Sequence, residues 1–194
     1  MRDPRYDVLF EPVSIGPLST RNRFYQVPHC TGMGYRYPRS EARLRGLKAE
    51  GGWAVVSTQE TEIHPSSDLT PSNEARLWDE RDIPALRLMT DAVHEHGSLA
   101  AIQLAHNGLH SGNRYSRALP LAPSHAVVDC DDPVQAREMS LRDIALFRQW
   151  HKDAAARACR AGFDIIYVYA GHDMTLLQHF LLRRHNHRSD EYGG

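Results

Sequence analysis

Side chains able to bind or transform a small molecule follow four apolar segments of this chain. They are His29, Cys30, Glu60, Gln103, Tyr169 and His172. A cysteine becomes a nucleophile when its thiol loses a proton, and a carboxylate pairs with cations and accepts N–H hydrogen bonds. A glutamine amide offers both a donor and an acceptor, and a tyrosine near a histidine can share a proton with it. The set predicts a site that holds a polar or cationic molecule and moves a proton.

Each of these residues also has a purely structural interpretation. A lone cysteine such as Cys30 is most often a small buried apolar residue, and Gln103 could bond only to the backbone. Glu60 could face solvent, Tyr169 could be a core aromatic residue, and His172 could be an ordinary loop histidine. The residue types alone leave these alternatives open.

The chain has twelve histidines, which invite a metal site. Three close pairs stand out: His94/His96, His106/His110 and His185/His187. No carboxylate or thiolate completes a ligand set at the usual spacing, so we expect no metal. The three cysteines, Cys30, Cys130 and Cys159, are widely spaced and form no CxxC. This predicts a reducing, cytoplasmic compartment without a disulfide framework.

The four apolar segments alternate with helical patterns. The apolar segments are 24–28, 53–58, 99–104 and 163–169, and the helices are expected over 40–50, 82–95 and from Ser140 to Gly162. Nearly continuous apolar strands between helices indicate a parallel sheet. A hairpin is expected from Val8–Phe10 and Val13–Ile15, and no helix is expected after Tyr169. A long segment, 106–139, is expected to form a loop at the rim of the substrate cavity.

Two architectures fit this alternation, a doubly wound sheet and part of a (β/α)8 barrel. The first strand is not followed by GxGxxG, which weakens the dinucleotide-binding version of the doubly wound sheet. Polar side chains directly after each strand favour the barrel, because barrel enzymes carry their chemistry at that end. We therefore expect an α/β fold, the N-terminal half of a (β/α)8 TIM barrel with an N-terminal capping hairpin. Residues 1–194 would form one partial domain.

The composition narrows the function classes. The formal net charge is −1, with 41% hydrophobic and 24% charged residues. This balance argues against a dedicated nucleic-acid or membrane-surface binder, both of which need a basic patch. No apolar stretch approaches the ~20 residues of a membrane helix, and the first residues do not resemble a secretory signal.

Several longer stretches resemble the old yellow enzyme (NADH:flavin oxidoreductase) family. They are Leu9–Arg23, Ile102–Gly108 and Asn186–Gly194. Within that family the chain is most similar to the trimethylamine, dimethylamine and histamine dehydrogenases. Arg23–Cys30, Lys48–Trp53 and Phe163–Tyr169 carry this closer resemblance, which extends over essentially the whole chain.

The resemblance implies a barrel that binds FMN through a 6-S-cysteinyl bond to Cys30, with Pro28, His29, Gln103 and His172 also at the flavin. It places Tyr169 and His172 in the active site as catalytic residues. In the trimethylamine enzyme a tyrosine that binds the substrate cation occupies the position of Glu60. The carboxylate of Glu60 therefore favours a primary or secondary amine, which has more N–H groups to donate. Tyr169 would also contact the substrate.

The expected activity is FMN-dependent oxidative N-dealkylation or deamination of a small amine. The resemblance also implies a 4Fe-4S cluster in regions beyond this chain, an electron-transferring flavoprotein as partner and a homodimer. Two alternatives remain: an NAD(P)H-dependent ene-reductase or demethylase of the same fold, and a non-catalytic half-barrel.

Overall fold

A parallel sheet forms the centre of the molecule in the computed structural model, which describes residues 3–34, 36–69, 75–128 and 134–194. Its strands lie in the order β10-β6-β4-β3 and are β3 (Tyr25–Gln26), β4 (Val55–Glu62), β6 (Leu99–Ala105) and β10 (Ile165–Val168). A short strand, β5 (Ala75–Arg76), pairs with the end of β4. The four main strands neighbour one another in sequence order, whereas a doubly wound sheet reverses its order. The topology is therefore that of half a barrel.

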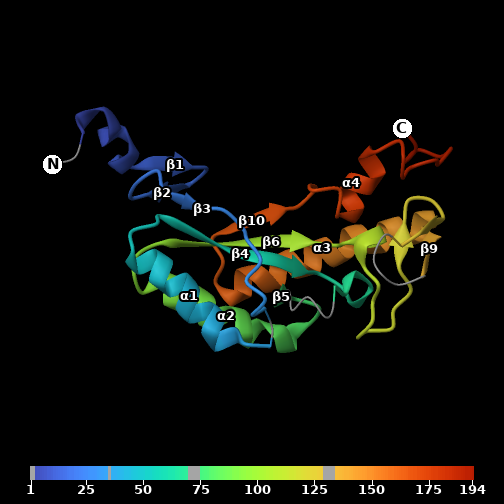
Figure 1. Cartoon of the computed structure of the whole chain (residues 1–194), viewed down its shortest axis with the longest axis horizontal. Coiled ribbons are helices and arrows are strands. Elements are labelled where there is room, and N and C mark those ends of the chain that lie inside the picture. The colour runs from blue at the N-terminus through green and yellow to red at the C-terminus, as the bar shows by residue number, and fades with distance from the viewer. Residues whose placement is uncertain (1–2, 35, 70–74, 129–133) are drawn as a thin grey trace.

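Three helices cover one face of this sheet: α1 (Pro38–Glu50), α2 (Ile83–His94) and α3 (Leu141–Ala161) (Figure 1). They pack on alternate residues of the strands. The sheet contributes Val56, Ala100, Ile102 and Leu104 to this core, and the helices contribute Leu86, Met89, Val93, Ile144, Phe147 and Ala158. Because successive strand residues point to opposite faces, the intervening residues, such as Ala101 and Gln103, point away from the helices.

The predicted ends of α3 are confirmed. Ser140 caps the first turn and exchanges hydrogen bonds with Asp143 in a capping box. Gly162 ends the helix in the left-handed conformation, with φ +100°. These two signals fix where the chain turns back into β10.

The N-terminal hairpin is present, but one of its strands was wrongly predicted. β1 (Val13–Ile15) pairs antiparallel with β2 (Leu18–Thr20) around Gly16, whose φ is +56°. Val8–Phe10 instead belongs to the 3-10 helix η1 (Pro4–Phe10). Asp3 caps this helix and Pro4 begins it, and these local signals outweighed the apolar run.

The long connections contain short elements of their own. They are η2 (Pro65–Ser67), η3 (Glu80–Asp82), η4 (Gly108–His110), β7 (Leu121–Ala122), β8 (Ala126–Val127) and β9 (Gln135–Glu138). The last three form a small sheet in the order β7-β9-β8. The expected loop over 106–139 is thus partly ordered into a sheet; Cys130 lies outside the described residues.

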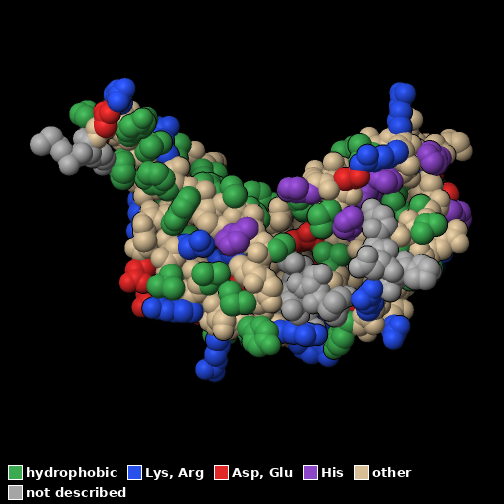
Figure 2. Space-filling view, viewed as in Figure 1, with side chains coloured by type: hydrophobic (Ala, Val, Ile, Leu, Met, Phe, Trp, Pro, Cys, Tyr) green, Lys and Arg blue, Asp and Glu red, His purple; other side chains and the backbone are tan. Residues whose placement is uncertain are grey.

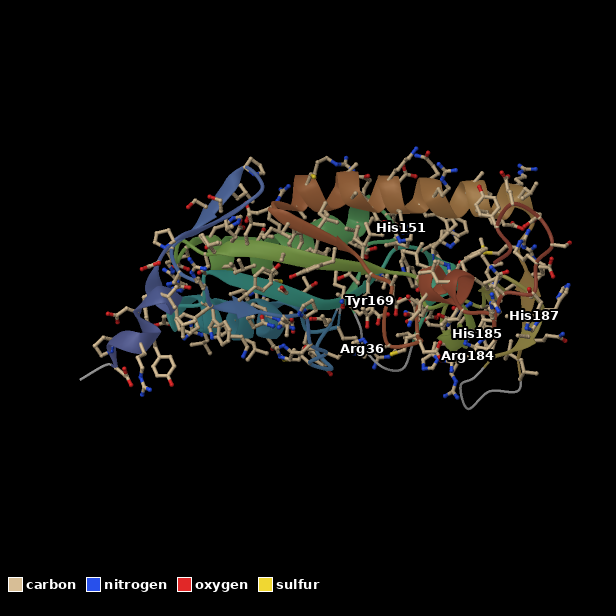
Figure 3. All side chains as sticks on the ribbon, turned by 90° about the horizontal axis from the view of Figure 1, so that it is seen from above. Arg36, His151, Tyr169, Arg184, His185 and His187 are labelled. Carbon is tan, nitrogen blue, oxygen red and sulfur yellow. The ribbon has the colours of Figure 1, made fainter. Side chains whose placement is uncertain are left out.

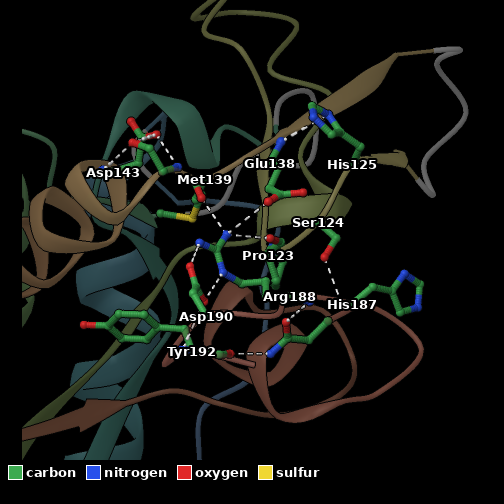
Figure 4. Close-up of polar contacts among 12 residues, drawn as sticks. Pro123, Ser124, His125, Glu138, Met139, Asp143, His187, Arg188, Asp190 and Tyr192 are labelled. Carbon is green, nitrogen blue, oxygen red and sulfur yellow. Dashed lines mark hydrogen bonds and ion pairs between the residues drawn. The ribbon is translucent and has the colours of Figure 1, made fainter. Parts of the chain in front are cut away.

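A helix also follows Tyr169, contrary to expectation: α4 (Leu176–Leu181). The segment after it is fastened by Arg188, whose side chain is 5% exposed (Figure 4). Arg188 donates to the carbonyl oxygens of Pro123 at 2.8 Å and Met139 at 2.5 Å, and it pairs with Asp190. The C-terminal motif of the family resemblance therefore ties α4 to the small sheet.

The face of the sheet away from the helices is hollow. Figure 2 shows this saddle between the N-terminal segment and the region around α4. Among the described residues, no helix is long and apolar enough to cross a membrane.

Candidate active site

The carboxyl ends of the four parallel strands bring the predicted residues to one edge of the sheet. Strand register places Glu60 of β4 opposite Gln103 of β6, and Gln103 opposite Tyr167 of β10. Residues paired in this way share a face, so these three side chains form a row facing the hollow. The register of β4 shifts between Ser57 and Glu60, and this irregularity sets which residues reach the row.

Glu60 does not face solvent. The residue is only 5% exposed, and it belongs to a strand that is buried along its whole length. Gln103 is half-buried, and its backbone N–H donates to Thr58 Oγ1 at 3.1 Å. A carboxylate and an amide thus lie side by side at the end of the sheet.

Tyr169 and His172 are bonded to each other. The Tyr169 hydroxyl contacts Nδ1 of His172. Burial, followed by the nearby Glu60 carboxylate and the Cys30 thiol, raises the pKa of Tyr169 to about 12. The phenol is therefore protonated at neutral pH and can donate to Nδ1 of His172 when that nitrogen carries no proton. Glu60 and Cys30 thus act on the tyrosine electrostatically.

The loop after β3 carries Pro28, His29 and Cys30. Pro28 is half-buried, while His29 and Cys30 are exposed. Nδ1 of His29 lies 3.0 Å from Gln26 Nε2 and 3.1 Å from a guanidinium nitrogen of Arg45. Both neighbours donate, so Nδ1 accepts and any ring proton sits on Nε2. Although the residue is exposed, partial burial of its ring, then the charges of Arg45 and Lys48, lowers the pKa of His29.

Arg45, which was not predicted as a site residue, organises this loop. Its side chain is fully buried on α1 and pairs with Glu41 at 2.6 Å. It also donates to Gln26 Oε1 at 3.1 Å, to the His29 carbonyl at 2.8 Å and to Gln59 Oε1 at 3.1 Å. These contacts fix the backbone one residue before Cys30. The Glu41–Arg45 spacing, four residues apart on an expected helix, was the available signal.

The structure therefore brings Cys30, Glu60, Tyr169 and His172 together, with Gln103 in the same row. His29 is turned instead toward Arg45 and α1. Seen from above, Tyr169 lies near the middle of the long axis, whereas Arg184 and His185 lie farther along it, near α4 (Figure 3).

One titratable cluster was not expected. Ligand atoms of Asp173, His179 and His185 lie within 4.8 Å of one another. The sequence around His185 showed no carboxylate at metal-ligand spacing. Asp173 supplies one in the fold, although it precedes α4 and His185 follows it.

The residues present fit a flavin. An exposed thiol can reach a ring laid in the hollow, and a half-buried glutamine amide can match the alternating N–H and C=O groups of the flavin's pyrimidine edge. These two groups lie at the same end of the sheet. The fit rests on the donor set and on the open inner face.

Residues 8–194 match the NADH:flavin oxidoreductase / NADH oxidase family, and the chain belongs to that family. The fold is that of the TIM-barrel flavoenzymes related to old yellow enzyme, as predicted.

Among individual proteins, the chain is 42% identical to the dimethylamine dehydrogenase of Hyphomicrobium sp. (strain x), covering 100% of this chain and 27% of that protein. The histamine dehydrogenase structure from Rhizobium sp. 4-9 is 52% identical with a TM-score of 0.96, covering 100% of this chain and 30% of the other. The structure of 6-hydroxypseudooxynicotine amine oxidase from Pseudomonas geniculata N1 is 49% identical with a TM-score of 0.97, covering 100% and 29%. The chain thus spans less than a third of the length of these relatives.

Proposed function

We propose that this chain forms the N-terminal part of the FMN-binding barrel of an enzyme that oxidises a small amine. The observation that carries the proposal is the Tyr169–His172 pair, with Glu60 and Cys30 close enough to raise the tyrosine's pKa. Bound FMN would accept two electrons from the amine's C–N unit, and the iminium product would hydrolyse to an aldehyde and a smaller amine or ammonia. The names of the relatives, dimethylamine and histamine dehydrogenase, support an amine substrate.

Cys30 would anchor the flavin. Its thiol would hold the ring through the 6-S-cysteinyl bond that the family resemblance implies. The exposure of Cys30 and the anchoring of the preceding residue by Arg45 support this role. Pro28, His29 and His172 would line the flavin site, and Gln103 would bond the pyrimidine edge.

Tyr169 and His172 would remove the proton that the ammonium substrate must lose before oxidation. Because the pKa of Tyr169 is about 12, a neutral phenol is present at neutral pH. It would pass its own proton to His172 Nδ1 while taking one from the substrate, so that the proton ends on the imidazole. The direct contact between the two side chains makes such a relay possible.

Glu60 would bind the substrate's ammonium group. It is 5% exposed, and a buried carboxylate gains most from a cation that also donates hydrogen bonds. Trimethylammonium has one N–H, whereas primary and secondary ammonium groups have more. We therefore propose that the enzyme prefers primary or secondary amines to trimethylamine.

The cofactor proposal is tested by mass spectrometry. The denatured holoenzyme should yield a peptide containing Cys30 with FMN attached, and Cys30→Ala should release any flavin on denaturation. Cys159→Ala is the matched control, since Cys159 is also exposed but lies on α3. Complete release of flavin from the unmodified enzyme would overturn the covalent bond.

The substrate proposal is tested by comparing kcat/KM for trimethylamine, dimethylamine and a primary amine. Glu60→Tyr should shift preference toward trimethylamine by about 5- to 150-fold, the range expected for one polar contact of roughly 1–3 kcal/mol. Glu62→Gln is the control, because Glu62 is a second buried carboxylate on β4 that accepts from the Leu69 N–H. A wild-type preference for trimethylamine would refute the role of Glu60.

Electron transfer through a 4Fe-4S cluster to an electron-transferring flavoprotein, and a homodimeric enzyme, complete the proposal. These features rest on the family resemblance. A reconstituted assay that couples amine oxidation to reduction of a purified electron-transferring flavoprotein tests the partner directly.

A further inference from the structure

The backbone at His172 is strained. Both His172 and Asp173 have φ +58°, in the left-handed region that residues other than glycine rarely occupy. Two consecutive residues of this kind carry a conformational cost. Such strain persists only where the surroundings hold it in place, so the contacts of this dipeptide are informative.

Asp173 is held at all four of its polar groups. Its N–H donates to Gln178 Oε1 at 2.6 Å, and its carbonyl oxygen lies 3.0 Å from Nε2 of His179. One carboxylate oxygen lies 3.2 Å from Nε2 of His185, and the other pairs with Arg184. All four contacts come from α4 and from the segment immediately after it, so a single part of the chain holds the left-handed turn.

The helix α4 is itself anchored in the core. Thr175, which caps α4, and Leu176 are both fully buried. The Leu176 N–H donates to the His106 carbonyl oxygen at 2.6 Å, which ties α4 to the end of β6. The position of Asp173 is therefore fixed, through α4, relative to the sheet that carries Gln103.

We propose that Asp173 is a positioning residue that holds His172 in the left-handed conformation and so keeps Nδ1 of His172 at the Tyr169 hydroxyl. We call Asp173 with Gln178, His179, Arg184 and His185 the α4 clamp. The inference rests on the proposed function, which gives the Tyr169–His172 pair its proton-transfer role.

The same atoms resemble a metal site, but their hydrogen bonding favours the clamp. Two imidazoles and a carboxylate are a ligand set that zinc or iron accepts. A carbonyl oxygen can only accept, so Nε2 of His179 carries a proton and leaves only Nδ1 of that ring to a metal. The carboxylate of Asp173 is also already neutralised by Arg184.

Asp173→Asn and Asp173→Ala in the holoenzyme test the clamp. Asparagine keeps the size and tolerates the left-handed region but loses the charge that pairs with Arg184. Alanine removes both carboxylate contacts, to Arg184 and His185, and keeps only the two backbone contacts. We expect kcat to fall by about 10-fold for Asn and about 100-fold for Ala, as for a catalytic group displaced by about 1 Å. KM for the amine should change by less than about 3-fold, since Glu60 is untouched. The pH dependence of kcat should shift, because His172 would lose its fixed partner.

Asp164→Asn is the matched control. Asp164 makes a similar aspartate–histidine contact at the other end of β10, where its carboxylate lies 2.8 Å from Nε2 of His94 and accepts from the Ala100 N–H at 2.8 Å. This variant should lose comparable stability while keeping kcat and the pH profile. Equal losses of kcat in Asp164→Asn and Asp173→Asn would reduce Asp173 to general structural support and overturn the proposal.

A crystal structure of Asp173→Ala provides a readout independent of activity. We expect His172 to leave the left-handed region and its Nδ1 to leave the Tyr169 hydroxyl; an unchanged pair would overturn the clamp. Tyr169→Phe and His172→Gln separate the two proposals. If they lower kcat but Asp173→Ala does not, only the clamp fails; if they leave kcat unchanged, the proton-transfer role fails. A stoichiometric divalent metal in the wild type that disappears in Asp173→Asn would establish a metal site instead.

Discussion

The two loops that carry the proposed chemistry are fixed in opposite ways. The loop after β3, which bears Cys30, is held by the Arg45–Glu41 pair, whose side chains are 0% and 8% exposed. The loop after β10, which bears His172, is held by Asp173 and Arg184, whose side chains are 35% and 62% exposed. A buried pair is costly to break, because the remaining charge has no solvent. An exposed pair contributes little by itself. The loop after β3 is thus held by a buried ion pair. The loop after β10 depends on several hydrogen bonds acting together.

The largest expected effect is from Arg45→Met. This change leaves the Glu41 carboxylate in the interior and removes the donors to Gln26, His29 and Gln59. We expect a loss of about 3–5 kcal/mol in the free energy of unfolding, measured by denaturant titration, together with reduced flavin content. Arg184→Met, at the exposed pair, should cost about 1 kcal/mol or less. Similar losses in the two variants would erase the contrast between the loops.

A third group of residues holds loops together through neutral histidines, and acidification tests it. His64 stacks on Trp150, with ring centroids 3.6 Å apart, and Ser66 links His64 to His106. Burial, then Arg157, lowers the pKa of His64 to about 4, and burial lowers the pKa of His106 well below its ordinary value. Both are therefore neutral in the folded protein near neutral pH.

Because these folded-state pKa values lie below the unfolded value, the folded protein binds fewer protons. The stability is fully present above about pH 6.5 and falls as the pH drops toward the folded pKa. We expect a loss of about 1–3 kcal/mol between pH 7 and 5, after allowing for the partial exposure of His64. Denaturant titrations at both pH values measure it, and His64→Gln should reduce the slope. Equal stability at both pH values would contradict this account.

Gly171→Ala should affect catalysis more than stability. An added Cβ would lie 2.8 Å from Cε2 of Tyr169, so the ring must move away from its place beside His172. We expect kcat/KM to fall by about 10- to 100-fold, with Tm nearly unchanged. Gly51→Ala, at the end of α1, is the control, since its Cβ would come no closer than 3.3 Å to a backbone oxygen. A fall in Tm as large as that in Arg45→Met would show that this loop is as rigidly built as the first.

A local effect is expected from Thr175→Ala, which removes the N-cap of α4. The Thr175 hydroxyl accepts from the Gln178 N–H at 3.4 Å. Loss of such a cap costs about 0.5–2 kcal/mol, and here it should appear as faster hydrogen exchange in α4. Thr175→Ser keeps the hydroxyl and should retain most of the protection. Unchanged exchange in Thr175→Ala would show that the clamp does not depend on the cap.

Local patterns predicted most of the scaffold. The helix expected over 40–50 is α1 (Pro38–Glu50), and the capping signals at Ser140 and Gly162 fixed both ends of α3. They failed where two local signals competed, as at Val8–Phe10, and where the element was short, as at α4. A helix of one or two turns has too little periodicity to detect.

The sequence by itself determined which residues could do chemistry and on which strands they lie, because apolar runs and caps are local and a strand end follows directly from them. Only the tertiary structure decided how those residues are supported. Glu60 is buried rather than solvated, on a strand that lies between β3 and β6 in the sheet. Arg45 reaches five acceptors because α1 lies against β3 and β4. Asp173 meets His185 only after α4 turns the chain back. Burial, and contacts such as those of Arg45 with Gln26 and Gln59, depend on segments distant in sequence, which a local pattern does not encode.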